Sequence, residues 1–233
     1  MKVISNEKQT VKNVKLTKIT LYASLIVLGL GFVVSIGTPN TLPNLILAVI
    51  ILIIGYILFR VNSGLTVRWG NSPRPDEKLV AALKGLPSEF TLYNYTTDLP
   101  YLLLGPSGIC LFEMIDANGI IYFDEISLKW KIRKQGSFFR RMLTSDQVGD
   151  LRKSAANLQS KWEKYTLEKL KMSDIPEPTV VMILNNPETE IDGKDPQMDL
   201  IRIDKLKDQV RKRPPLTGSI LAKIVDLTKI LPQ

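Results

Sequence analysis

Six cations and three aromatic residues are interleaved over twenty positions in the middle of the chain, and together they could bind a polyanion. Segment 126–145 contains no Asp or Glu; its aromatic residues are Trp130, Phe138 and Phe139, and its cations are Lys129, Lys131, Arg133, Lys134, Arg140 and Arg141. Cations for phosphate and aromatic rings for base stacking are the components of non-specific nucleic-acid binding. The same cations would suit anionic lipid head groups. A solvated hairpin with a few core aromatics is the third reading of this segment.

Composition excludes several kinds of catalytic site. The chain of 233 residues has no histidine and one cysteine, Cys110. Histidine-based triads, histidine-ligated zinc and thiolate-rich metal sites are therefore excluded, and no intramolecular disulfide can form. A metal site in this chain would use carboxylates, which suit Mg²⁺ or Mn²⁺.

Two uncharged apolar runs, 19–36 and 42–59, lie before the polar part of the chain and are separated by five turn-forming residues. Eighteen residues at 1.5 Å each are just long enough to cross a hydrocarbon core about 30 Å thick. We therefore predict an α-helical transmembrane hairpin. Gly29, Gly31 and Ser35 are small residues that could let its two helices approach closely, or could equally be ordinary residues tolerated in lipid.

The charges around these runs predict the orientation of the hairpin. Residues 1–18 form a basic tail with five lysines and one glutamate, the connecting loop is uncharged, and Arg60 and Arg68 follow the second run. Positive residues favour the cytoplasmic side. We expect an integral membrane protein with two spans, whose termini and soluble domain are cytoplasmic. The tail holds +4 of the formal charge of +8, so much of the basicity would face anionic lipid.

Beyond a linker over 62–75, the pattern alternates between helices and strands. Amphipathic spacing predicts helices, alternation and short apolar runs predict strands, and the uninterrupted run 179–184 predicts a strand buried on both faces. The expected helices are 76–86, 146–171, 204–211 and 217–230, and the expected strands are 90–95, 101–104, 109–114, 119–123, 126–133, 179–184 and 200–203. This order predicts an α/β (α+β) sandwich around one mixed β-sheet flanked by helices.

Several strings in this region resemble the nuclease-related domain (NERD) family, which is similar to the PD-(D/E)xK nucleases. The segment 102–113, LLLGPSGICLFE, resembles the central hairpin of that family, and Asp76-Glu77 resembles the opening of its first helix. Asn118-Gly119-Ile120 resembles a Gly-x-Ile turn of that family, Gln147 matches a glutamine at the head of its long helix, and 179–191 resembles its late buried strand with the Asn-Pro turn. The resemblance implies a NERD-like domain over 76–213. The sequence pattern adds a C-terminal helix, segment 214–233, which we expect to pack on this domain.

The resemblance also implies where a metal-dependent active site would lie. Such sites place an acidic residue on one strand and Glu-x-Lys on the next, where carboxylates hold the metal and the lysine assists the nucleophile. The chain keeps Glu113, but Pro100 stands where the first aspartate is expected and Ile115 stands where the lysine is expected. The substitutes in the chain are Asp98, Asp116 and Glu77 as metal ligands, Gln147 beside them, and Lys129 or Lys131 as a migrated lysine.

Two functions follow as expectations, beside a third possibility of a purely structural membrane protein that binds no polyanion. The first is a membrane-anchored, catalytically degenerate nuclease-fold module that binds nucleic acid, anionic lipid or a protein partner and needs no cofactor. The alternative is an Mg²⁺- or Mn²⁺-dependent nuclease in which Asp98 and Glu113 hold the metal and Lys129 or Lys131 assists.

Overall fold

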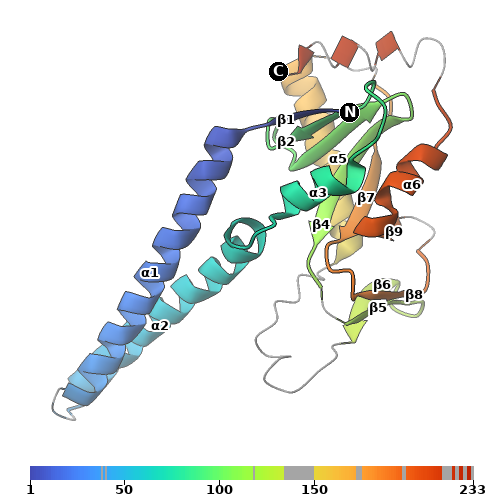
Figure 1. Cartoon of the computed structure of the whole chain (residues 1–233). Helices are drawn as coiled ribbons and strands as arrows, with labels where there is room; N and C mark the ends of the chain where they lie inside the picture. Colours follow the sequence, from blue (N-terminus) through green and yellow to red (C-terminus); the bar gives the residue numbers. More distant parts are fainter. Residues whose placement is uncertain are drawn as a thin grey trace. The chain divides into compact units, whose positions relative to one another are not determined.

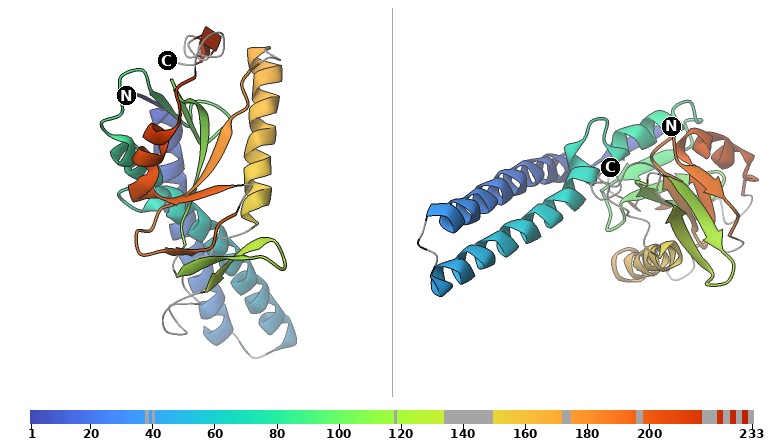
Figure 2. Two further views of the ribbon diagram at one scale, coloured as in Figure 1. Left: turned by 90° about the vertical axis from the view of Figure 1, so that its right-hand side faces the viewer. Right: turned by 90° about the horizontal axis from the view of Figure 1, so that it is seen from below.

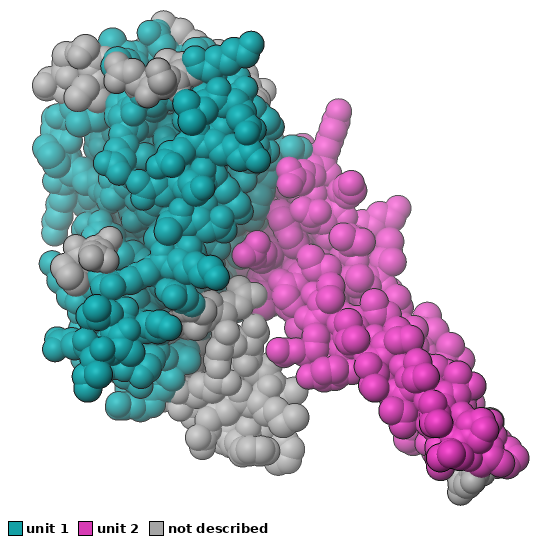
Figure 3. Space-filling view, turned by 180° about the vertical axis from the view of Figure 1, so that it is seen from behind, with its two compact units in different colours: residues 1–6, 75–233 teal, residues 7–74 magenta. Residues whose placement is uncertain are grey.

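A computed structural model of the chain describes residues 1–37, 39, 41–117, 119–133, 150–171, 175–195, 198–216, 222–223, 226–227 and 230–231. The chain forms two compact units, coloured separately in Figure 3. One comprises Glu7–Arg74. The other comprises Met1–Asn6 and Pro75–Gln233.

The unit Glu7–Arg74 is a helical hairpin (Figure 1). Helix α1, Glu7–Gly37, and helix α2, Leu42–Leu65, contain the two predicted apolar runs, and a π-helical turn, Thr66–Gly70, continues α2. Both helices are long and apolar enough to cross a membrane, and only 11% of the most apolar stretch of each is buried. The core helix of a soluble protein would be mostly buried, so the two predicted apolar helices are confirmed as helices with an outward apolar surface.

The helices of the hairpin pack through a seam of small side chains. The buried residues recur every seven positions and are Thr10, Thr17, Ser24 and Gly31 on α1 and Ala48, Gly55 and Asn62 on α2. A seven-residue period winds two helices around each other with a left-handed twist, and small residues bring their backbones close. Gly31 abuts Leu52, and Gly55 abuts Leu28, where an added Cβ would lie 3.0 Å from the Leu28 backbone nitrogen.

This seam corrects part of the sequence prediction. Of the three small residues predicted to allow close approach, Gly31 does so, whereas Gly29 has nothing within 4 Å of an added Cβ and Ser35 is exposed. The helix has 3.6 residues per turn, so Gly29, two residues before Gly31, points away from the face that Gly31 presents to α2. Ser35 lies one turn beyond Gly31, where the helix surface is exposed.

The second unit is built on a six-stranded sheet with the order β1-β2-β3-β4-β7-β9. Its strands are β1 (Lys2–Ser5), β2 (Thr91–Asn94), β3 (Tyr101–Gly105), β4 (Gly108–Ile115), β7 (Thr179–Leu184) and β9 (Asp199–Arg202). Strands β2, β3 and β4 are antiparallel neighbours, and β4, β7 and β9 run parallel. Parallel strands need a crossover, which the long helix between β4 and β7 supplies.

Strand β1 differs from the sequence prediction of a basic tail over 1–18. Lys2–Ser5 pairs in parallel with Thr91–Asn94, and α1 begins at Glu7. The Asn94 side-chain amide also donates to the Ser5 hydroxyl, at 3.2 Å. Four residues before an amphipathic lysine-rich stretch carry too little periodicity to be recognised as a strand. The predicted linker 62–75 is likewise mostly helical, and only Asn71–Arg74 separates Gly70 from the next helix.

Helices cover both faces of the six-stranded sheet (Figure 2). Helix α3 (Pro75–Leu83) and helix α6 (Leu206–Lys212) pack on one face against Leu103, Phe112 and Ile183. Helix α5 (Leu151–Tyr165), extended by a turn to Leu170, packs on the other through Leu158 and Trp162. The predicted α/β domain is thus confirmed as a mixed sheet between helices. The helix predicted over 217–230 lies largely outside the described residues.

A second, three-stranded sheet replaces the single sheet that the sequence predicted. Its order is β6-β5-β8, formed by β5 (Ile120–Asp124), β6 (Lys129–Arg133) and the unpredicted β8 (Glu190–Asp192). Strands β5 and β6 form an antiparallel hairpin, and β8 pairs in parallel with β5. A strand pattern predicts alternation but not the partner, so periodicity could not assign these residues to a separate sheet.

Candidate functional site

The predicted cations of β6 share one exposed face. Along Lys129–Arg133, exposed and buried side chains alternate, so that Lys129, Lys131 and Arg133 point outward and Trp130 points into the core. Lys134, Arg140 and Arg141, with Phe138 and Phe139, lie outside the described residues. The strand therefore presents three of the six predicted cations together.

The outward face of this small sheet also carries three carboxylates. Directly paired residues lie on the same face of a sheet, which places Asp124 beside Lys129, Glu190 across β5 from Arg133, and Asp192 across β5 from Lys131. Lys131 forms an ion pair with Asp124, and the Arg133 guanidinium lies over the Tyr122 ring, 5.3 Å from its centroid. The three cations are thus balanced by three acids, which weakens the case for a polyanion site on this face.

Asp124 organises the turn between β5 and β6. Its carboxylate accepts from the Ile126 backbone N–H at 3.2 Å, from the Ser127 hydroxyl at 2.7 Å, and from the Lys131 ammonium. These donors favour the charged form, with Lys131 contributing most, and they lower the pKa of Asp124 to about 2. The same contact raises the pKa of Lys131.

The turn that Asp124 holds exposes two aliphatic side chains. Ile126 is 97% exposed and Leu128 is 54% exposed. Leu128 also has a left-handed backbone, with φ +52°. We call Ile126–Leu128 the hairpin tip. Sequence reasoning treated Ile126 and Leu128 as strand residues, because hydrophobicity alone does not distinguish a strand from a turn.

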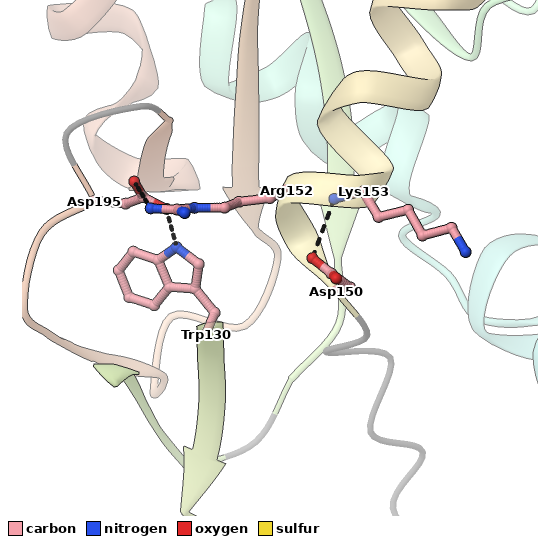
Figure 4. Close-up of polar contacts among 5 residues, drawn as sticks. All are labelled: Trp130, Asp150, Arg152, Lys153 and Asp195. Atoms are coloured by element: carbon pink, nitrogen blue, oxygen red, sulfur yellow. Dashed lines mark hydrogen bonds and ion pairs between the residues drawn. The ribbon is translucent and has the colours of Figure 1, made fainter. Parts of the chain in front are cut away.

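The small sheet is joined to helix α5 by a buried carboxylate (Figure 4). The Asp195 side chain is fully buried. It accepts from Arg152 twice, from Nε and from one terminal nitrogen, each at 2.8 Å, and from the Trp130 indole N–H at 3.2 Å. Arg152 also lies over the Phe123 ring, 5.2 Å from its centroid. We call Asp195, Arg152 and Trp130 the clamp.

The clamp connects three segments that are distant in sequence. Asp150 caps α5 by accepting from the Lys153 backbone N–H at 3.1 Å, which fixes the first turn that carries Arg152. Trp130 comes from β6, and Asp195 follows β8. Arg152 and Asp195 are not recognisable from the sequence, since single charged residues in a polar stretch carry no signal of burial.

The residues predicted for a metal-dependent site are distributed over several elements. Glu113 lies half-buried on β4 of the large sheet, whereas Lys129 and Lys131 lie on β6 of the small one. Asp98 lies in the β2–β3 connection, where the Lys169 ammonium is 3.1 Å from its carboxylate. Glu77 is exposed in the first turn of α3, and Asp116 follows β4. Gln147 lies outside the described residues.

The described residues contain no group of three Asp, Glu, Cys or His side chains that could hold a metal ion. Asp98 and Lys131, two members of the predicted catalytic set, instead pair with Lys169 and Asp124. Among the described residues, therefore, no three of the substitute ligands lie together.

A groove of about 530 Å³ runs beside α5. Its lining includes Arg152, Ala155 and Gln159 from the helix, and Glu177, Thr179 and Asp199 from the adjoining chain. The volume is in the range of small-molecule sites. However, Gln159 donates to Glu177 at 2.8 Å, and Arg152 belongs to the clamp. Asp199 likewise accepts from Arg213 at 3.3 Å, so these polar groups already have partners within the protein.

The densest positive charge lies in the hairpin unit. Glu7–Arg74 holds seven of the 31 Lys and Arg residues and one of the 23 Asp and Glu residues, a formal charge of +6, which leaves +2 for the α/β unit. Lys8, Lys12, Lys15 and Lys18 are exposed on the first part of α1, and Arg60 and Arg68 are exposed near the end of α2. Since α1 and α2 are antiparallel, these cations gather at the same end of the hairpin. We call them the basic collar.

No protein-family model matches the chain, and no curated protein or solved structure matches it either. The description of this chain therefore rests on its own features. These are two helices of membrane-spanning length and composition with a basic collar, and a mixed α/β domain.

Proposed function

We propose that this chain is a membrane-anchored binding module. In this proposal α1 and α2 cross the bilayer, both termini and the α/β domain are cytoplasmic, and the basic collar binds anionic lipid head groups. One observation carries the proposal, namely that six exposed cations gather where the apolar part of the hairpin ends. The α/β domain then acts at the membrane surface as a scaffold for a further partner.

The dimensions of α1 support the lipid-binding part. Its apolar part begins at Ile19, so twelve helical residues, Glu7–Lys18, extend beyond it. At 1.5 Å per residue this polar part is about 18 Å long, enough to pass through the head-group region. Each lysine near an anionic surface contributes about 1 kcal/mol. Four lysines on this stretch therefore give a preference for anionic lipid of up to about 4 kcal/mol before screening by salt.

Strand β1 supports the topology. It precedes α1 yet belongs to the same sheet as β2, which follows α2. A folded sheet cannot be divided by a bilayer, so the two ends of the hairpin have to emerge on the same side. The positive-inside rule makes that side the cytoplasm.

In this proposal the α/β domain is related to the NERD family, and its own catalytic centre is degenerate. It is supported by the Gly-Pro-Ser-Gly turn between β3 and β4, in which Gly108 has φ +110°, and by Glu113 on β4. Pro100 and Ile115 at the expected chemical positions, and the ion pairs made by Asp98 and Lys131, argue for binding without cleavage.

Lipid preference tests the proposal directly. The full chain would be reconstituted in vesicles of phosphatidylcholine with a minor fraction of phosphatidylglycerol, and enrichment of a fluorescent anionic lipid around it measured by energy transfer from tryptophan. The test variant changes Lys8, Lys12, Lys15 and Lys18 to Gln. The control changes the exposed Lys153, Lys161, Lys205 and Lys212 to Gln, which removes the same charge from the α/β domain.

We expect the collar variant to lose most of the enrichment and the control to keep it, with the wild-type preference falling as salt rises. Equal enrichment around all three proteins would contradict the proposal. The same preparation tests the alternative of a nuclease. Mg²⁺- or Mn²⁺-dependent cleavage of DNA or RNA that is lost in Glu113→Gln would show a rearranged catalytic site and overturn the degenerate assignment.

A further inference from the structure

The hairpin tip is an unusual surface for a soluble domain. Two aliphatic side chains, Ile126 and Leu128, lie next but one to each other and are 97% and 54% exposed. Single exposed aliphatic residues are common on protein surfaces. Here two exposed aliphatic residues lie on one turn, and the exposed Lys129 follows Leu128 directly in the sequence. Together they form a small apolar patch next to a cation.

The tip is held in a fixed shape by hydrogen bonds. Asp124 accepts from the Ile126 N–H and the Ser127 hydroxyl, so the turn is closed around its carboxylate. Leu128 adopts φ +52°, a conformation that residues with a branched side chain seldom take. Such backbone strain persists only where the surroundings enforce it, and it is frequent at functional sites. In this conformation the Leu128 side chain is 54% exposed.

The base of the tip is packed against the core of the domain. Directly below it, Phe123 and Trp130 pack with ring centroids 5.4 Å apart, and Trp130 donates to the buried Asp195 of the clamp. Ile121 on β5 is fully buried. The small sheet that carries the tip is therefore attached to α5, and this attachment holds the tip away from the surface of the domain.

Two short connections join this domain to the helices of the hairpin. Only Asn6 separates β1 from α1, and only Asn71–Arg74 separates the end of the hairpin from α3. Four residues span at most about 14 Å. A domain on such tethers stays near the end of the hairpin that carries the basic collar, so a weak apolar contact with the lipid surface is made at raised effective concentration.

We propose that the hairpin tip, Ile126–Leu128, is a second membrane contact that inserts its two aliphatic side chains into the lipid surface. This inference rests on the proposed membrane anchoring and adds a contact made by the α/β domain itself. Lys129 beside the tip is suited to anionic head groups, whereas the exposed Glu125 opposes them, so insertion depends mainly on Ile126 and Leu128. Amphipathic contacts of this kind combine buried apolar area with attraction to anionic lipid.

Site-directed fluorescence in lipid tests the inference. An environment-sensitive dye would be attached to Ile126→Cys in the full chain, reconstituted in vesicles that contain lipids with a spin-label quencher on the upper acyl chain. The matched control is Leu167→Cys, which replaces another exposed aliphatic residue of the same domain. The native Cys110 is buried, so the wild type should remain unlabelled.

Dye at position 126 should show a blue shift and quenching by the labelled lipid, and dye at position 167 should show neither. With the dye moved to Ser127→Cys, quenching should disappear when Ile126 and Leu128 are both changed to Ser. A dye at position 126 that is blue-shifted but not quenched by lipid would indicate burial against protein and overturn the inference. So would a dye that remains fully accessible to aqueous iodide.

A dye on Gly29→Cys separates this inference from the proposed function. Gly29 lies on the outer surface of α1, with nothing within 4 Å of an added Cβ. If the dye at 29 is quenched by labelled lipid and the dye at 126 is not, the helices are in the membrane and only the tip inference fails. If neither is quenched, membrane anchoring itself is wrong.

Discussion

Replacing Asp195 by Ala should detach the small sheet from helix α5. The wild-type carboxylate is fully buried and accepts three hydrogen bonds, two from Arg152 and one from Trp130. Removing one partner of a buried, hydrogen-bonded ion pair costs about 3–5 kcal/mol, because the other charge is left without compensation. A domain of this size has a total stability of about 5–15 kcal/mol. The substitution should therefore remove a large fraction of it.

The assay is urea unfolding of the full chain in detergent micelles, followed by tryptophan fluorescence and by trypsin cleavage at Lys129 and Lys131. The matched control, Asp192→Ala, removes an exposed carboxylate three residues away and should change stability by less than about 0.5 kcal/mol. Combining Asp195→Ala with Arg152→Leu should cost less than Asp195→Ala alone, since no uncompensated charge remains.

Two outcomes would refute this reasoning. A loss below about 1 kcal/mol for Asp195→Ala would mean that Arg152 regains its hydration when the carboxylate is removed. A double variant less stable than Asp195→Ala would mean that Arg152 contributes mainly through packing, for example over the Phe123 ring.

Two further predictions follow from the same structure. Gly55→Leu should separate the helices of the hairpin, since an added Cβ would lie 3.0 Å from the Leu28 backbone nitrogen, whereas Gly29→Leu, with nothing within 4 Å, should leave them packed. A disulfide between cysteines introduced at Gly31 and Leu52, which abut each other, reports the spacing, and equal cross-linking in both variants would contradict the proposed seam. The hairpin tip should loosen only in acid: the pKa of Asp124 is lowered to about 2 from 3.8, so its contribution to stability is complete above about pH 4 and is lost as the pH falls towards 2. Hydrogen exchange of the Ile126 N–H, corrected for its intrinsic pH dependence, should reveal that loss, and Asp124→Asn should abolish the pH effect; an unchanged protection factor in wild type down to pH 2 would disagree.

The hairpin and the α/β class could be predicted from sequence because their signals are local. Apolar runs 19–36 and 42–59 lie inside α1 and α2, and the uninterrupted apolar run at 179–184 coincides with β7. The alternation of exposed and buried residues in β6 also agrees with period-two patterning. Each of these inferences needs only neighbouring residues.

The candidate sites were predicted less accurately than the hairpin and the fold class, because they depend on contacts between segments that are distant in sequence. Cations over 126–145 predicted a positive surface, but Lys131 pairs with Asp124, and β8 brings Glu190 and Asp192 to the same face. Asp98 and Lys131 were considered for catalysis, yet both form ion pairs with residues outside the proposed active site. No residue spacing could have indicated that Asp195 is buried beneath Arg152 and Trp130.

The sequence by itself determined the length and polarity of the two apolar helices, the position of the basic collar and the alternation of strands and helices, because periodicity and charge act over a few residues. The tertiary structure alone decided that Lys2–Ser5 completes the large sheet, that the strands divide between two sheets, and that Ile126 and Leu128 stand exposed on a supported turn. These features depend on pairing between residues as much as 89 positions apart, which hydrophobic patterning does not encode.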